Sequence, residues 1–383
     1  METIRYIEAF GGIGAFTQAI NNLNIPNELI DYIEHDVFCV RSFNAINNTQ
    51  FPVQDVTEWT KNLECDLLMG GPPCQDISLA GKQKGAKKGS GTRSSLLFEM
   101  SRMASLIKPK YIVVENVRNL VSDKHRKEFD EYLEELRLLG YESCWSIINS
   151  KDQEMPQNRE RVFIVSIHGS NRFSFPNPKE LKIWLKDLLE SEVDEKYYLS
   201  ESTIKKFSDM TNRNGYIRGE RFNPIDLENQ KYAYCIDTRE GQRPEDNFLL
   251  EKIGGVAIPE ATVKGYAIAK HGDGVYINRP HQKRGCVQKG MIQTLTTSCK
   301  DIGVVVIDGS RYRIRRLTPL ECWRLMGFKD ECFYKAKEVN SKTQLYKQAG
   351  NSIVVNVLEA ILKKLFLKEE LEGQISIFDL MGD

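Results

Sequence analysis

The chain has 383 residues, of which 41% are hydrophobic and 28% are charged, and its formal net charge at pH 7 is zero. Its nine cysteines include no Cys-x-x-Cys pair, no run is long and apolar enough to span a membrane, and the N-terminus lacks a signal-peptide layout. These features argue against a disulfide framework or a metal site. They predict a soluble cytoplasmic or nucleoid-associated protein with one large domain and a smaller one.

The first predicted unit is a strand, a glycine-rich turn and a helix. Residues 5–10 form the strand, Gly11–Gly14 the turn and residues 16–23 the helix. Glycines let a nucleotide-like ligand approach the backbone, although a purely structural turn has the same composition. The next strand, residues 29–33, ends in Glu34, where a carboxylate can accept hydrogen bonds from a ribose.

Three further strand ends are predicted to present polar groups at one edge of a sheet. A short strand ends at Asp55, and the strand Leu67–Met69 is stopped by two glycines and two prolines, after which comes Cys74. The strand 111–114 ends in Glu115. Open α/β sheets bind ligands at such strand ends, whereas an isolated cysteine is more often a small buried hydrophobe.

Basic residues between Lys82 and Arg93 alternate with glycines, which is typical of a solvated turn or of a lid that closes over phosphates. Helices are predicted at 96–106, with an apolar core stripe, and at 124–139; a strand follows at 144–148. Arg159 and Arg161 then precede the strand 162–165 and are predicted to point the same way from an extended segment. The alternative is a surface salt-bridge pair.

Residues 172–312 lack the alternation of strands and helices that precedes them. They contain short irregular runs with a helical part at 183–189 and several arginine clusters, which can contact phosphates or guanine bases. Thr318, Pro319 and Glu321 then predict a capped helix start, and a final helix is predicted to open at Gly350-Asn351-Ser352.

Seven motifs in this order resemble the DNA (cytosine-5) methyltransferase family over residues 4–365, and together they make coincidence very improbable. They are Phe10-x-Gly12-x-Gly14, Pro72-Pro73-Cys74-Gln75, Glu115-Asn116-Val117, Gln157-x-Arg159-x-Arg161, Thr294-Leu295-Thr296, the helix start at Thr318-Pro319, and Gly350-Asn351-Ser352. One departure is Glu8, where many relatives have Asp, and it conserves the charge. The resemblance implies an α/β fold: a doubly wound, mostly parallel, Rossmann-like methyltransferase sheet with a smaller, irregular target-recognition domain.

The resemblance also assigns roles to individual residues and places domain boundaries. Residues 1–171 and 341–383 would form the catalytic domain that binds S-adenosyl-L-methionine, and residues 172–340 the target-recognition domain. The catalytic residues would be Cys74, Glu115, Arg159 and Arg161. The cofactor would be bound by Phe10, Gly12, Gly14, Glu34, Asp55, Asn351 and Ser352. Double-stranded DNA would be contacted by Gln75, Ser78, Lys82, Arg93, Thr296 and Thr297.

The chemistry explains why these residue types are needed. Carbon-5 of cytosine becomes nucleophilic when a thiolate adds to carbon-6 and the ring is protonated at N3, which predicts Cys74 as nucleophile and Glu115 as proton source. Arg161, supported by Arg159, would hold O2, and the base must be flipped out of the duplex. The reaction requires no metal.

Three alternatives remain at this point. A transfer-RNA methyltransferase of the same fold would have a similar loop, but Asp76-Ile77-Ser78 and the long recognition region favour DNA. A DNA-binding module without activity is disfavoured by the intact catalytic motifs, and a nicotinamide oxidoreductase by the glycine spacing. We also expect a monomer whose tail, Gln374–Phe378, resembles the peptide by which bacterial proteins bind the replication sliding clamp; packing of this tail on the first domain is the alternative.

Overall fold

The computed structural model describes the first 170 residues almost completely and the rest in segments. The described ranges are 2–73, 96–169, 173–198, 200, 202, 224–227, 230–238, 240, 242–243, 246–252, 256–261, 266–270, 274–276, 286–289, 302–304 and 312–367. Several predicted site residues and the clamp-like tail lie outside these ranges, namely Cys74, Gln75, Ser78, Lys82, Arg93, Thr296, Thr297 and Gln374–Phe378.

A six-stranded sheet with the order β2-β1-β3-β4-β6-β5 forms the centre of the first part of the chain. The pairs β1–β2, β1–β3 and β3–β4 are parallel, whereas β6 runs antiparallel to both β4 and β5. The predicted mostly parallel α/β sheet is therefore confirmed, with β6 as the reversed strand. The strands are β1 (Ile4–Ala9), β2 (Asn27–Ile33), β3 (Leu67–Gly70), β4 (Tyr111–Val117), β5 (Tyr141–Asn149) and β6 (Glu160–His168).

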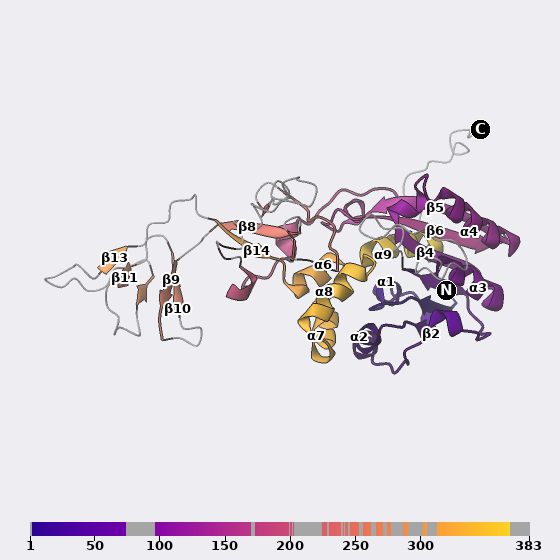
Figure 1. The fold of residues 1–383 in the computed structure, drawn as a ribbon, viewed down its shortest axis with the longest axis horizontal. Coiled ribbons are helices and arrows are strands. Elements are labelled where there is room, and N and C mark those ends of the chain that lie inside the picture. Colours follow the sequence, from indigo (N-terminus) through magenta and orange to yellow (C-terminus); the bar gives the residue numbers. More distant parts are fainter. Residues whose placement is uncertain are drawn as a thin grey trace, which may run out of the picture. The chain divides into compact units, whose positions relative to one another are not determined.

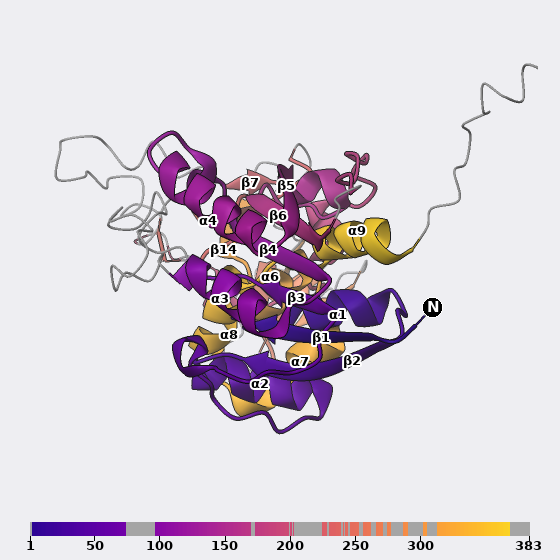
Figure 2. The same cartoon turned by 90° about the vertical axis from the view of Figure 1, so that its right-hand side faces the viewer.

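Helices cover both faces of this sheet, as Figure 2 shows. Alternate residues of β1 point to opposite faces. Ile7 and Ala9 join the apolar core formed with α3 (Leu97–Ile107) and α4 (Arg126–Leu138). On the other face, the Tyr6 hydroxyl lies 3.0 Å from the Thr17 hydroxyl of α1 (Ala15–Asn22). The predicted core stripe of α3 is confirmed at Leu97, Met100 and Met103, which are buried, but is wrong at Leu106, which is exposed near the end of the helix.

The chain divides into two compact units. The first contains residues 1–192, 230–246 and 317–383, and the second contains 193–229 and 247–316. The helices of the first unit's C-terminal part are α6 (Pro319–Leu325), α7 (Asp330–Val339), α8 (Lys342–Asn351) and α9 (Val355–Phe366). The functional division into catalytic and recognition domains stays a prediction, but α6, α7 and residues 230–246 pack with the first unit although they lie between residues 172 and 340.

The second unit is built of short strands, in agreement with its irregular composition (Figure 1). Its sheets have the orders β14-β8-β7, β10-β9 and β12-β11-β13. The strands are β7 (Ile225–Asp226), β8 (Phe248–Lys252), β9 (Val256–Pro259), β10 (Tyr266–Ala269), β11 (Gly274–Tyr276), β12 (Val287–Gln288), β13 (Ile302–Val304) and β14 (Tyr312–Arg316). Among the described residues of the whole chain, no helix is long and apolar enough to cross a membrane.

The predicted start of the helix at Thr318 is confirmed. Thr318 caps α6: its hydroxyl accepts a hydrogen bond from the Glu321 amide at 3.2 Å, and the Glu321 carboxylate accepts one from the Thr318 amide at 2.8 Å. With Pro319 in the first turn, this is the predicted capping box. The predicted helix at 183–189 is reduced to a 3-10 turn, Leu185–Leu188.

Two predicted elements are wrong. The segment before Asp55 is not a strand, because side-chain hydrogen bonds rather than a strand ladder hold it: Gln54 and Trp59 both donate to the buried Asp31 at 2.9 Å. Gly350 and Asn351 end α8 rather than open α9, which begins only at Val355.

Candidate active site

Two of the groups predicted to do chemistry, Glu115 and Arg161, meet at one edge of the sheet. Strand β3 ends at Gly70 and leads through Pro73 toward Cys74, while Glu115 lies near the end of the neighbouring β4. Because β6 is antiparallel to β4, the start of β6 lies beside the end of β4, with Arg161 opposite Val117. The reversed strand therefore brings an arginine to the edge where the parallel strands end.

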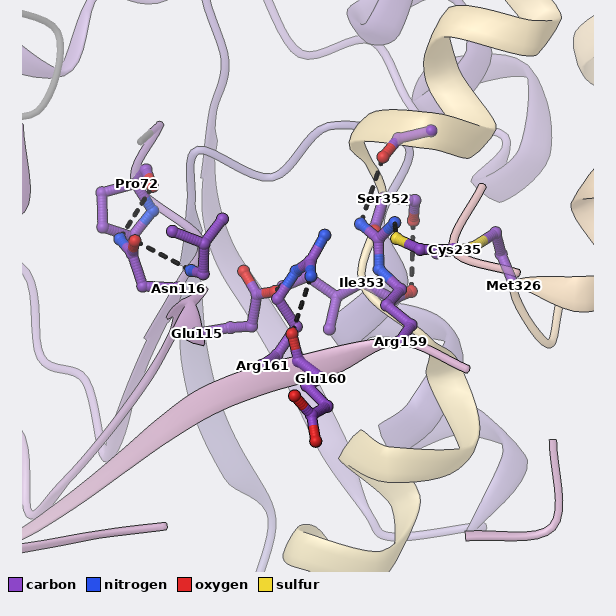
Figure 3. A network of polar contacts seen from close by, with 12 residues as sticks. Pro72, Glu115, Asn116, Arg159, Glu160, Arg161, Cys235, Met326, Ser352 and Ile353 are labelled. Carbon is purple, nitrogen blue, oxygen red and sulfur yellow. Dashed lines mark hydrogen bonds and ion pairs between the residues drawn. The ribbon is translucent and has the colours of Figure 1, made fainter. Parts of the chain in front are cut away.

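Glu115 and Arg161 form a buried ion pair (Figure 3). Arg161 Nε lies 3.1 Å from Glu115 Oε1, and only 8% of Glu115 is exposed. Burial raises the pKa of Glu115 above its ordinary value, and the charges of Arg161 and Arg159 counteract part of this rise. A carboxyl group with a raised pKa beside a fixed cation can hold a proton and deliver it to a substrate.

The turn that leads to Cys74 is fastened to β4. Asn116 Nδ2 donates a hydrogen bond to the Pro72 carbonyl at 3.2 Å (Figure 3). A Cβ added at Gly71 would lie 3.1 Å from Ile353 Cδ1 and 3.6 Å from Glu115 Oε2, so this glycine permits close packing beside the carboxylate. Asn116 and Ile353 were missed as site residues, because their partners come from distant parts of the chain.

Arg159 lies on the same side of the strand as Arg161, as predicted, and both line one small cavity, but Arg159 has other partners (Figure 3). Arg159 is 4% exposed, and its guanidinium donates to the carbonyls of Ile236 at 2.8 Å, Gly350 at 3.1 Å and Ser352 at 2.8 Å. Arg161 instead contacts Glu115 and the Glu160 carbonyl. Burial, together with the Arg161 charge, lowers the pKa of Arg159. The two arginines therefore have different partners.

The backbone of the glycine turn after β1 is open at Gly12. Phe10, Gly12 and Gly14 have φ of +52°, +53° and +84°, a conformation that glycine adopts readily. A Cβ built on Gly12 would meet nothing within 4 Å, so the backbone faces open space there. Glu34, predicted at the end of β2, accepts a hydrogen bond from the Gly12 amide at 3.0 Å and from Asp36 at 2.7 Å. The structure thus brings Gly12 and Glu34 together.

The contacts of Glu8 bear on whether the cofactor contains a diphosphate. Its buried carboxylate accepts hydrogen bonds from the amides of Phe16 at 3.2 Å and Thr17 at 3.1 Å, at the start of α1. Burial raises the pKa of Glu8 to about 7. Dinucleotide-binding folds place a pyrophosphate at this helix N-terminus. Here Glu8 already occupies those donors, which fits a cofactor without a diphosphate.

The remaining predicted cofactor residues lie at two other places. Asp55 begins a 3-10 turn and accepts a hydrogen bond from the Thr57 amide at 2.9 Å. Arg102 donates to the carbonyls of Val56 at 2.6 Å and Trp59 at 2.7 Å and so fixes this loop. Asn351 is exposed at the end of α8, whereas Ser352 is buried. Within the described ranges, no group of three or more His, Cys, Asp or Glu could hold a metal ion.

Comparison with known proteins places these features in one family. The model of the family described as C-5 cytosine-specific DNA methylase matches residues 4–367. Type II methyltransferase M2.ScrFI of Lactococcus lactis subsp. cremoris is 32% identical, and the match covers 95% of this chain and 99% of that protein. Orphan methyltransferase M.SPRI of Bacillus phage SPR is 33% identical, with 95% and 98% covered.

Solved structures show the same fold at low sequence identity. The Entamoeba histolytica methyltransferase EhMeth matches with a TM-score of 0.65 and 18% identity, covering 96% of this chain and 100% of that one. The S. pombe Dnmt2 methyltransferase matches with a TM-score of 0.61 and 18% identity, covering 96% and 98%. The likeness extends over nearly the full length of each chain.

Proposed function

Because the chain belongs to the C-5 cytosine-specific DNA methylase family, and is therefore an S-adenosyl-L-methionine-dependent DNA cytosine-5 methyltransferase, we propose that Cys74, Glu115 and Arg161 perform its chemistry. The observation that supports this most strongly is the buried Glu115–Arg161 pair. The pair lies beside Gly71, which precedes Cys74 by three residues.

The proposed mechanism assigns one task to each residue. The Cys74 thiolate adds to carbon-6 of a flipped cytosine while Glu115 gives a proton to N3 and Arg161 holds O2. Carbon-5 then carries electron density, and S-adenosyl-L-methionine supplies the methyl group. Loss of the carbon-5 proton to a base expels Cys74 as the thiolate, N3 returns its proton to Glu115, and the aromatic ring is restored. Asn116, through Pro72, would set the direction from which the thiolate approaches.

The residues of the glycine turn fit the cofactor. Gly12 leaves open space above the backbone, Phe10 would pack on the cofactor, and Glu34 would hold its ribose. Asp55, on the loop fixed by Arg102, would meet the adenine amino group, and Asn351 with Ser352 would close the site.

Glu34→Ala should weaken S-adenosyl-L-methionine binding. Removing one charged hydrogen-bond acceptor is expected to reduce the binding free energy by about 1.5–3 kcal/mol, since the bonded group is lost while its partners are left unsatisfied. Isothermal titration calorimetry measures this directly. Glu28→Ala, at a surface position of the same strand β2, serves as the matched control, and unchanged affinity in Glu34→Ala would contradict the assignment.

We further propose that residues 172–312 select the DNA sequence. Their arginine-rich, irregular composition supports this role. Exchange of this segment with that of a relative of known target is expected to transfer the target. Sequencing of modified DNA at base resolution identifies the site, and continued modification of the original site by a folded chimera would contradict the proposal.

The substrate assignment has its own experiment. We expect transfer of labelled methyl groups to duplex DNA and none to transfer RNA under the same conditions, with cytosine as the modified base. The relatives named type II and orphan methyltransferases come from bacteria and phages, which supports a role of this enzyme on bacterial or phage DNA in the cytoplasm or nucleoid. Preferential methylation of transfer RNA would overturn this part.

The tail, Gln374–Phe378, is proposed to bind the bacterial sliding clamp. Ile377 and Phe378 would fill an apolar pocket while Gln374 donates hydrogen bonds at its rim, and tethering would raise the enzyme's concentration at new DNA. Fluorescence anisotropy of a labelled tail peptide with purified clamp should show saturable binding that Phe378→Ala abolishes. Absence of saturable binding would exclude this interaction.

A further inference from the structure

Arg159 is a buried cation whose hydrogen-bond partners, among the described residues, are carbonyl groups and a sulfur rather than a carboxylate. Nη1 donates to Ile236 O and lies 3.5 Å from Cys235 Sγ, while Nη2 donates to Gly350 O and Ser352 O. A guanidinium has a rigid fork of donors, so one side chain can fix several backbone segments at once. These segments are 77 to 193 residues away along the chain.

The first of these segments is an extended strap, residues 233–238. Its Ala233 exchanges backbone hydrogen bonds of 2.8 Å with Pro156 and Asn158. The Ile236 amide donates to Gln157 Oε1 at 3.1 Å, and Gln157 Nε2 donates to Leu325 O of α6 at 2.8 Å. Gln157 is fully buried. Gln157 and Arg159 together therefore bind the strap to the start of β6.

The strap also lies directly on the end of α8. A Cβ added at Gly350 would come within 2.3 Å of the Asp237 carbonyl carbon and 2.5 Å of the Thr238 amide nitrogen. No side chain fits at such distances, so glycine is required here for close approach rather than for an unusual φ. The end of α8 and the strap thus form one packed junction, and Arg159 is bonded to both.

This junction reaches the proposed active site through Ile353. Arg159 bonds the Ser352 carbonyl, and the next side chain, Ile353, packs against Gly71 and beside Glu115. The cavity lined by Arg159, Arg161 and Ile353 has a volume of only about 10 Å³. In so closely packed an interior, a shift of the turn displaces its neighbours.

We propose that Arg159 is a positioning residue: it fixes the strap 233–238 and the Gly350–Ser352 turn to the start of β6, and through Ile353 it holds the Gly71–Pro73 turn and Glu115 in register, without touching cytosine. The inference rests on the proposed roles of Cys74 and Glu115. Among the three members of the Gln157-x-Arg159-x-Arg161 motif, only Arg161 then contacts the base.

A double-mutant cycle tests whether Arg159 and Gly350 act through one junction. Arg159→Lys keeps the positive charge but loses the guanidinium's fork of hydrogen-bond donors. Gly350→Ala displaces the strap without changing any charge. Each is expected to slow single-turnover methyl transfer at least about tenfold at saturating cofactor, with the dissociation constant for duplex DNA changed less than about threefold. The double variant should be at most about twofold slower than the slower single variant. If the rate losses of the two single variants multiply in the double variant, or if the substitutions change only DNA affinity, the proposal is wrong.

Hydrogen exchange gives a readout that does not depend on activity. The amides of Ala233 and Ile236 should exchange at least about tenfold faster in Arg159→Lys, because the strap opens more often. Arg118→Lys, at an exposed arginine bonded to Glu160, is the control and should change neither exchange nor rate. Unchanged exchange in Arg159→Lys would overturn the inference, whereas a wild-type protein that methylates no DNA would refute the proposed function instead. Gln157→Met replaces Gly350→Ala in the cycle if the latter does not fold.

Discussion

Cys74→Ser is expected to lower the rate of methyl transfer by at least about a thousandfold, to the limit of detection. Serine keeps the size of the side chain, but its hydroxyl is far less acidic than a thiol and is a poor nucleophile without an adjacent base. The addition to carbon-6 on which all later steps depend would then fail. Binding of S-adenosyl-L-methionine should be unchanged, because none of the proposed cofactor residues is altered.

Duplex DNA with 5-fluorocytosine at the target position separates loss of the nucleophile from other defects. Fluorine at carbon-5 cannot leave as a proton does, so the wild-type enzyme should remain covalently attached to the methylated base, and denaturing electrophoresis detects the complex. Cys144→Ser, which changes a half-buried cysteine of β5, should behave as wild type. A covalent complex formed by Cys74→Ser would show that another residue is the nucleophile.

The sheet could be predicted because burial of its strands requires apolar runs in the sequence. Apolar runs such as Leu67–Met69 and 111–114 are strands in the structure, and Glu115, which follows the second run, lies near the end of β4. The same logic placed Glu34 beside the glycine turn, where it bonds Gly12. Periodicity reports which faces are buried, and in a parallel sheet strand direction then determines where the ends meet.

The role of Arg159 could not be predicted in the same way. Spacing of two residues on a strand suggests a shared direction with Arg161, but the guanidinium of Arg159 is bonded to three carbonyls. Backbone carbonyls carry no sequence signature, so their availability depends on how residues 236 and 350–352 fold. The segment before Asp55 failed for a related reason: hydrogen bonds to Asp31 replace the strand ladder there.

The contact between Glu115 of β4 and Arg161 of β6 could not be predicted from the sequence, although both residues could. Glu115 and Arg161 were both predicted from motifs, yet their 3.1 Å contact depends on β6 running against its neighbour. A parallel β6 would have placed Arg161 at the opposite edge of the sheet. The reversal of one strand therefore creates the acid–cation pair on which the proposed proton transfer depends.

Glu115→Gln is the second substitution with a large expected effect, and we expect it to lower kcat by about 10²–10⁴-fold. Glutamine keeps the shape and can still donate a hydrogen bond to N3, but it cannot transfer a proton. Glu160→Gln, which neutralises a partly exposed carboxylate beside Arg161 in the same strand, is the matched control and should retain kcat within about twofold.

The raised pKa of Glu115 predicts the direction in which stability and rate change with pH. Burial raises the pKa of Glu115 above its ordinary value, so the proton is held to higher pH in the folded protein than in the unfolded chain. The stability that this proton contributes is fully present below the unfolded-state pKa and is lost as pH rises through the folded-state pKa. The unfolding free energy of the wild type, relative to Glu115→Gln, should therefore fall as pH rises across that interval.

The rate of a step that uses the same proton should fall with it, and glutamine should abolish this limb of the profile. A wild-type advantage in stability that grows with pH, or a Gln variant that retains the limb, would show that Glu115 is held ionised and that the N3 proton comes from another group.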